Sequence, residues 1–173
     1  IRKIYITILL TGKRNLNILM INGMNLVTIG KHKQGDHSLQ ITRQSEYAIR
    51  TLVEMAKHAA DETLSTQAIA LRQEIPADFL KKTVKLLILA RLVTTQRGIN
   101  GGLRLARPAE EISLLDIITA VDGPIALNVC LAEGNNCKNQ NSCSISAALA
   151  KAQDAMVNEL AKISLASLAK ANE

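Results

Sequence analysis

A two-residue turn between two amphipathic stretches is the feature that most constrains the fold of this chain. The Ser65-Thr66 pair can cap a short helix that runs to Gln73, and Pro76 stands where the first turn of a helix tolerates proline. Residues 77–91 then repeat apolar side chains on one helical face. Because only Glu74-Ile75 separate the two stretches, the sequence predicts a helix-turn-helix.

The next segment predicts a β-hairpin. Residues 93–97 alternate like a strand, residues 98–102 form a glycine-rich turn, and residues 103–105 return as a second strand. A hairpin directly after a helix-turn-helix is a wing, although a purely structural hairpin is the alternative. Its basic flanks favour a wing that touches nucleic acid.

Three further helices complete the expected fold. Thr42 can cap a helix whose apolar positions run from Ala48 to Ala56. Ser113 and Asp116 can form a capping box for a helix that Gly123-Pro124 stops, and an Ala-rich helix runs from Ser144 to about residue 161. With no Trp, two Tyr and one Phe, the core must be aliphatic. The predicted fold class is mainly α with a small β-hairpin wing, a winged helix-turn-helix followed by a long C-terminal helix.

The long helix carries a continuous apolar stripe along one side. The stripe consists of Ile145, Leu149, Ala152, Met156, Leu160 and Ile163. A stripe of this length favours packing against a second copy of the chain, so we expect a homodimer. The alternative is that the helix folds back on the winged domain of its own subunit.

The first 38 residues are interpreted as an N-terminal extension of doubtful order, for which disorder is one expectation. They start at Ile rather than Met and lack helical periodicity, which is compatible with upstream sequence included by a misplaced start. Their apolar run over residues 4–10 is too short to span a bilayer and is followed by no small-residue cleavage site. We therefore assign the extension no function and expect no membrane partner.

Positive charge is concentrated in the first half of the folded part. Residues 43–107 hold eleven bases and six acids, whereas residues 108–173 hold four bases and eight acids. This asymmetry predicts a basic surface for double-stranded DNA, although charged helix faces are also common on ordinary solvated surfaces. The expected base-facing residues are Lys81, Lys82, Thr66 and Gln67, and the expected backbone contacts are Lys85, Arg97, Asn100 and Arg104.

All three cysteines of the chain fall in one short loop, CLAEGNNCKNQNSC. Cys130, Cys137 and Cys143 are separated by six and then five residues, and thiolate is the soft ligand that iron-sulfur clusters and zinc require. Zinc is disfavoured because the close Cys-x-x-Cys pairs of structural zinc sites are missing. A third hypothesis is that the thiols bind no metal and act directly as redox sensors. The odd cysteine count without a secretory signal indicates a reducing cytoplasm rather than a disulfide framework.

The chain resembles the Rrf-type winged-helix transcriptional regulators, in particular their iron-sulfur subgroup. The stretches that carry the resemblance are LQITRQSEYAIRTLVEMA, TTQRGINGGLRLARPAEEISLLDIITAVDGP and ISLASLAK. The resemblance implies a DNA-binding domain over residues 39–108, a linking helix and cluster-binding loop over 109–143, and a dimerisation helix with a C-terminal segment over 144–173. It also implies a regulator, expected to be a repressor, whose operator affinity depends on the cluster.

The resemblance further implies a ligand set. Members with three cysteines in this loop generally bind an iron-sulfur cluster, and Glu46 matches the position from which one branch supplies a carboxylate of the partner subunit. Its alternative is a surface ion pair with Arg50 at i+4. Ser146 stands where the cluster-biogenesis branch uses histidine, so a four-iron centre is slightly favoured over a two-iron centre. His32, His37 and His58 are weaker candidates.

An enzyme and a protein-binding adaptor are the two other classes of function to compare with the sequence. An enzyme is not expected, because the sequence shows no paired acid and base, no phosphate-binding glycine loop and no Ser-His-Asp grouping. A protein-binding adaptor with a degenerate winged helix would leave the lysine face unused. A cluster-free thiol-based or metabolite-responsive regulator of the same family is the remaining alternative.

Overall fold

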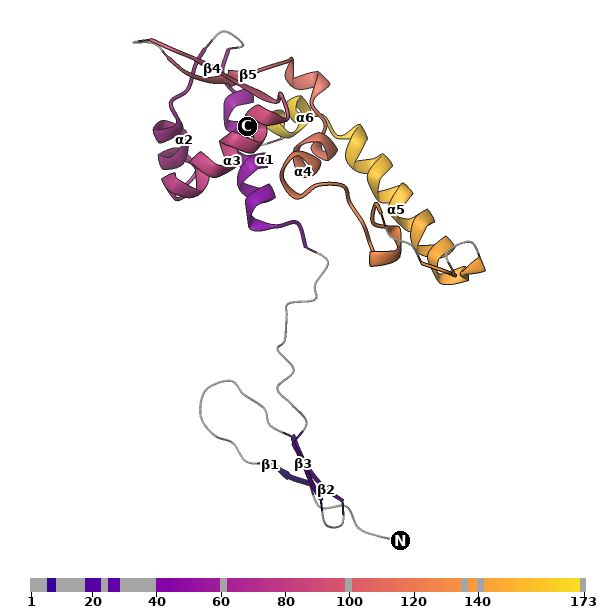
Figure 1. Cartoon of the computed structure of the whole chain (residues 1–173). Coiled ribbons are helices and arrows are strands. Elements are labelled where there is room, and N and C mark those ends of the chain that lie inside the picture. The colour runs from indigo at the N-terminus through magenta and orange to yellow at the C-terminus, as the bar shows by residue number, and fades with distance from the viewer. Residues whose placement is uncertain are drawn as a thin grey trace. The chain divides into compact units, whose positions relative to one another are not determined.

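The computed structural model describes residues 40–59, 62–98, 101–134, 137–139 and 142–171, together with three short strands in the first 38 residues. Figure 1 shows two compact units, Ile1–Leu39 and Gln40–Glu173. The first unit contains β1 (Ile6–Ile8), β2 (Ile18–Asn22) and β3 (Asn25–Thr28), which pair as an antiparallel sheet in that order. No element was expected in these residues, because they lack steady helical periodicity and an evident cap.

The second unit contains the predicted helices and hairpin. Its elements are α1 (Arg43–Ala56), α2 (Thr66–Arg72), α3 (Ala77–Leu89), β4 (Val93–Gln96), β5 (Gly102–Leu105), η1 (Ala109–Glu111), α4 (Leu114–Asp122), η2 (Val129–Leu131), α5 (Ser144–Lys162) and α6 (Leu165–Lys170). The mainly helical fold class with a two-stranded wing is confirmed. No described helix is both long and apolar enough to cross a membrane.

Side-chain caps set the helix starts that the sequence predicted. Thr42 accepts a hydrogen bond from the backbone N–H of Ser45 at 3.1 Å, so α1 begins at Arg43. The Ser65 hydroxyl accepts from the N–H of Ala68 at 3.0 Å and caps α2. At α4, Ser113 and Asp116 form the complete capping box.

The wing is attached to the helix-turn-helix by backbone pairing. β4 and β5 are antiparallel, with Val93 opposite Leu105 and Gln96 opposite Gly102. Leu64, just before α2, exchanges two backbone hydrogen bonds with Leu103, at 2.9 and 2.8 Å. Because Leu64 and Leu103 are also buried, the wing cannot shift without disturbing the start of α2.

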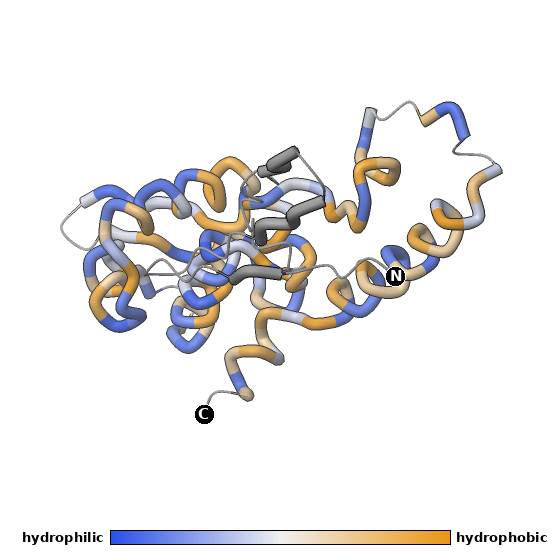
Figure 2. The backbone as a smooth tube through the Cα atoms, turned by 90° about the horizontal axis from the view of Figure 1, so that it is seen from below, coloured by the Kyte–Doolittle hydropathy of each residue, from blue (hydrophilic) through white to orange (hydrophobic). Residues whose placement is uncertain are grey.

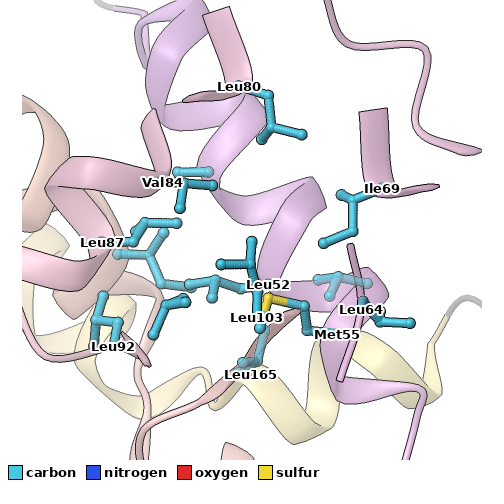
Figure 3. Packing of buried hydrophobic residues seen from close by; sticks show 14 of the residues in the cluster. Leu52, Met55, Leu64, Ile69, Leu80, Val84, Leu87, Leu92, Leu103 and Leu165 are labelled. Carbon is cyan, nitrogen blue, oxygen red and sulfur yellow. The ribbon is translucent and has the colours of Figure 1, made fainter. Parts of the chain in front are cut away.

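An aliphatic core lies between α1, α3, the wing and α6. Leu52 on α1, Leu87 on α3 and Leu165 on α6 are fully buried, and Figure 3 shows the labelled side chains of these elements converging on one another. Along the helices hydrophobic and hydrophilic residues alternate, as Figure 2 shows. A core of Leu, Ile, Val and Ala is what the near absence of aromatic residues predicted.

The C-terminal part differs from the sequence interpretation in one respect. The long helix ends at Lys162, and Ile163 takes an extended conformation with φ −82° and ψ 108° instead of continuing the apolar stripe. The extended residues pair with the segment before α4, with hydrogen bonds from the Leu114 N–H to Ile163 O at 2.8 Å and from the Leu165 N–H to Ile112 O at 2.7 Å. The chain then re-enters the core through α6.

A network of polar side chains connects α1 to the end of α2. The Glu54 side chain, 11% exposed, accepts hydrogen bonds from Arg72 at 3.0 Å and from the Gln73 amide at 2.9 Å. Burial alone would raise the pKa of Glu54, but the hydrogen bonds and the charge of Arg72 outweigh burial and hold the pKa below its ordinary value. Stability from this carboxylate is therefore present above its unfolded-state pKa and lost as pH falls through the folded-state pKa.

Replacing Glu54 by Gln is expected to lower the free energy of unfolding at pH 7 by about 1 kcal/mol, a modest value because Arg72 is half-exposed. Because the variant has no carboxylate at position 54, its free energy of unfolding should fall less than that of the wild type as the pH is lowered below about 4. Urea unfolding at several pH values measures both effects. Glu110→Gln, at an exposed carboxylate of η1 outside this network, is the control. Equal pH dependence in wild type and Glu54→Gln would contradict the prediction.

Candidate DNA-binding face and cysteine loop

Helix α3, the second helix of the helix-turn-helix, exposes its lysines. Lys81, Lys82 and Lys85 are exposed, whereas Leu80 and Leu87 of the same helix face the core. Nζ of Lys81 lies 3.1 Å from Oδ1 of Asp78, an exposed ion pair at the start of the helix. The lysines therefore lie on one exposed face of α3. In helix-turn-helix proteins the N-terminal part of the second helix enters a major groove.

The other predicted DNA contacts surround this helix. Gln67 is exposed and Thr66 is half-buried in the first turn of α2, while Arg97 and Arg104 are exposed on the wing. Arg104 lies opposite Thr94 in the hairpin. Asn100 lies outside the described residues. Of the predicted contacts that the structure describes, all are exposed or half-buried and none belongs to the core.

Contacts from α1 fix the turn of the helix-turn-helix, and the sequence analysis did not find them. The Arg50 guanidinium donates to the backbone carbonyl of Gln73 and, at 3.4 Å, to its side-chain Oε1. The rings of Tyr47 and Phe79 meet edge to face, with centroids 5.4 Å apart. Because the chain has only two Tyr and one Phe, the presence of Tyr47 and Phe79 in these two helices was the one sequence signal for this contact. It ties the start of α3 to α1.

Gly102 lies where the wing and the segment before α2 are closest. A Cβ atom at this position would lie 2.8 Å from the carbonyl oxygen of Leu64 and 3.1 Å from Cβ of Thr63. We expect Gly102→Ala to separate the paired backbones, lowering the free energy of unfolding by about 1–3 kcal/mol and raising amide exchange at Leu64. Thr95→Ala, at an exposed position of β4, is the control. Unchanged exchange at Leu64 in the Gly102 variant would refute the prediction.

The cysteine loop connects α4 to α5. Cys130 is half-buried in η2, Cys137 is exposed, and Cys143 is the N-cap of α5, where its sulfur accepts from the Ser146 N–H at 3.5 Å. The N–H of Leu127 donates to Oε1 of Gln153 at 3.0 Å, which fastens the start of the loop to α5. All three thiols are free.

The donor set has the chemistry that an iron-sulfur cluster needs, since it consists of three unpaired soft ligands on one loop. In the parts of the chain that the structure describes, no three His, Cys, Asp or Glu side chains are gathered closely enough to hold a metal ion. Residues 135–136 and 140–141 of the loop are outside those parts. The loop therefore contains the kind of ligand that a cluster needs. Binding of a cluster would require the three sulfur atoms to approach one another.

The predicted fourth ligand and the histidines are placed as follows. Glu46 lies in the first turn of α1 with its side chain 46% exposed, 3.3 Å from Arg43 and 3.7 Å from Arg50. The surface ion pair that the sequence analysis weighed against ligation is thus present within one chain. His58 lies between two glutamates, 3.0 Å from Glu62, and His32 and His37 are outside the described residues.

Comparisons with known proteins agree with this architecture. A relative from Mycobacterium tuberculosis, the putative HTH-type transcriptional regulator Rv1287, is 39% identical over 88 residues, a match that covers 51% of this chain and 55% of that protein. The HTH-type transcriptional regulator NsrR of Oceanobacillus iheyensis is 30% identical over 136 residues, 78% of this chain and 92% of that protein. Both are regulators of transcription by name.

Solved structures show the same fold. CymR of B. subtilis, described as its global cysteine regulator, aligns with a TM-score of 0.64 and 26% identity over 79% of this chain and all of that chain. IscR of T. potens aligns with a TM-score of 0.61 and 25% identity over 80% and 92% of the two chains. A family model described as "Rrf2: Iron-dependent Transcriptional regulator" matches residues 41–171. The winged helix-turn-helix, its wing and the helices after it therefore make this chain a member of the Rrf2 family of transcriptional regulators.

Proposed function

We propose that this protein is a homodimeric, DNA-binding regulator, acting as a repressor, whose operator affinity is controlled by an iron-sulfur cluster on the cysteine loop. The observation that carries the proposal is the pairing of an exposed lysine face on α3 with three free thiols in the loop between α4 and α5. The iron-dependent description of the family supports the same reading. Since its ligand is the operator, we place the protein in the cytoplasm.

The DNA contacts follow from the exposed side chains. Lys81 and Lys82, near the N-terminal end of α3, would reach base edges, assisted by Thr66 and Gln67. The backbone contacts assigned to the operator's phosphates are Lys85, Arg97, Asn100 and Arg104. Because such contacts release counterions, the logarithm of the affinity should fall linearly with the logarithm of salt concentration. An adaptor with a degenerate winged helix would give no salt-sensitive retardation in a gel-shift assay.

The second copy would pack along α5. Of the 19 residues of this helix only Ser146 is buried, and Ile145 remains 66% exposed. Val129, in the adjoining 3-10 turn, is 77% exposed. Exposed apolar side chains on a long helix are typical of a surface that a partner covers. A dimer would present two recognition helices to successive major grooves, about 34 Å apart.

The cysteine loop would hold the cluster through Cys130, Cys137 and Cys143, with Glu46 of the partner subunit as the fourth ligand. When bound, the cluster supplies a centre that reacts with nitric oxide or oxygen or is lost when iron is scarce. A four-iron centre is favoured because Ser146, which is buried, stands where a histidine ligand would be needed. Ligation also engages the sulfur that caps α5, so the start of that helix is coupled to the state of the loop.

The composition of the purified protein tests the proposal. Anaerobic preparations should contain iron and sulfide and show a visible absorption spectrum, and Cys137→Ala should lose most of that absorbance. Ser142→Ala, in the same loop, is the matched control because its hydroxyl makes only an exposed contact with the Asn139 carbonyl. A colourless, iron-free wild type would point instead to thiol sensing, for which the exposed Cys137 is the most accessible group. Bound zinc without sulfide would indicate a zinc site.

A further inference from the structure

A carboxylate clamp joins the end of α4 to the beginning of α1. Asp122 is the last residue of α4, and its two side-chain oxygens accept hydrogen bonds from the hydroxyls of Thr42 and Ser45, each at 2.7 Å. Ser45 is fully buried, whereas Asp122 is exposed. The clamp therefore joins a buried position in the first turn of α1 to a carboxylate that solvent can reach.

The clamp lies next to the cysteine loop along the chain. Gly123 follows Asp122 with φ at 81°, which ends α4, and seven residues separate Asp122 from Cys130. The loop is fastened at Leu127 to Gln153 of α5. Within one subunit, a change in how the loop is held can therefore reach the rest of the fold through the end of α4 or through α5.

The other side of the clamp leads to the DNA-binding face. Ser45 belongs to the first turn of α1, and Arg50 of the same helix holds the backbone of Gln73 in the turn before α3. Tyr47 packs against Phe79 at the start of α3. A tilt at the first turn of α1 would thus be passed to the helix that carries Lys81 and Lys82.

We propose that Asp122 is a positioning residue through which the state of the cysteine loop reaches the recognition helix. The inference rests on the proposed function, because it explains how a bound cluster could change operator affinity. Asp122 would hold Thr42 and Ser45 in one state of the loop and release them in the other. The two hydrogen bonds of Asp122 would be formed in one state and broken in the other, and both the loop and the bound operator would shift the balance between these states.

The test compares operator binding of the cluster-loaded and demetallated full-length protein, in wild type and in variants. In wild type the two affinities should differ by about 5- to 150-fold, and in Asp122→Ala by about twofold or less. Asp122→Asn, which retains one acceptor, should keep part of the difference. Asp116→Ala is the matched control, because it removes another two-bond carboxylate from the opposite end of α4, and it should behave as wild type.

Hydrogen exchange of residues 73–75, the turn that Arg50 of α1 holds, gives a second readout that does not depend on DNA and does not include the proposed ligand Glu46. Exchange should differ between the loaded and demetallated wild type and be equal in the two forms of Asp122→Ala. If Asp122→Ala does not fold, Ser45→Ala removes one bond of the clamp and should reduce both differences. A wild-type affinity ratio in Asp122→Ala, or an equal loss in Asp116→Ala, would overturn the clamp and leave the proposed function standing. Equal affinities in wild type would overturn both.

Discussion

Replacing Leu165 by Ala is expected to lower the free energy of unfolding by about 3 kcal/mol. Leu165 is fully buried and enters the core from α6, next to Leu52 and Met55. Truncating a buried leucine loses the transfer free energy of the removed atoms and leaves a cavity, which together amount to about 2–5 kcal/mol. Since domains are stable by only about 5–15 kcal/mol, this is a large fraction of the total.

The same substitution should loosen the C-terminal end of α5. The backbone of Leu165 is bonded to Ile112, and the preceding Ile163 is bonded to Leu114. Urea unfolding measures the stability loss, and hydrogen exchange at residues 112–114 measures the loosening. Leu71→Ala is the matched control, because Leu71 is 82% exposed on the similarly short helix α2 and its loss should change stability by about 0.5 kcal/mol or less. Similar losses for Leu165 and Leu71 would contradict the core assignment.

Replacing Lys81 and Lys82 together by Ala is expected to weaken operator binding by roughly 100-fold, since each base-edge contact contributes about 1–3 kcal/mol. Both side chains are exposed on α3, so the fold should be unaffected. Gel-shift titrations of the DNA upstream of the protein's own gene give the affinity. The same titrations should be repeated on unrelated duplexes. Loss of base contacts should reduce the ratio of the affinity for the operator to the affinity for unrelated DNA.

Removal of two positive charges elsewhere provides the control for this result. Lys57 and Lys151 are also exposed, but one ends α1 and the other lies on α5. Their joint replacement by Ala changes the net charge equally and should weaken binding only through long-range electrostatics, which salt screens. If both double variants lost the same affinity at physiological salt, α3 would not be the recognition helix.

Local signals in the sequence were sufficient for most of the fold. Thr42, Ser65 and the Ser113–Asp116 capping box determine where helices begin, and Gly123 determines where α4 ends, because each acts through backbone groups a few residues away. The lysine face of α3 could be predicted for the same reason. Helical periodicity alone separates Lys81 and Lys82 from the core leucines.

Interactions between distant residues could not be predicted. The sequence does not indicate that Arg50 reaches the turn carbonyl of Gln73, that Asp122 holds Ser45, or that the chain turns at Ile163 and returns through α6. These contacts depend on how helices pack, and a stripe of apolar residues is compatible with several partners. For the same reason the thiols could be identified as ligands by type, while their approach to one another depends on the loop conformation.

If the cysteine loop controls DNA binding, equilibrium titration of one fluorescent operator duplex should show the effect of the cluster on affinity. The anaerobic cluster-loaded homodimer and the same preparation after metal removal should differ in affinity by a factor of about 5 or more, with Cys137→Ala matching the demetallated form under both conditions. Equal affinities of the loaded and demetallated wild type would contradict the account and leave a DNA-binding protein that does not sense the state of its cysteines.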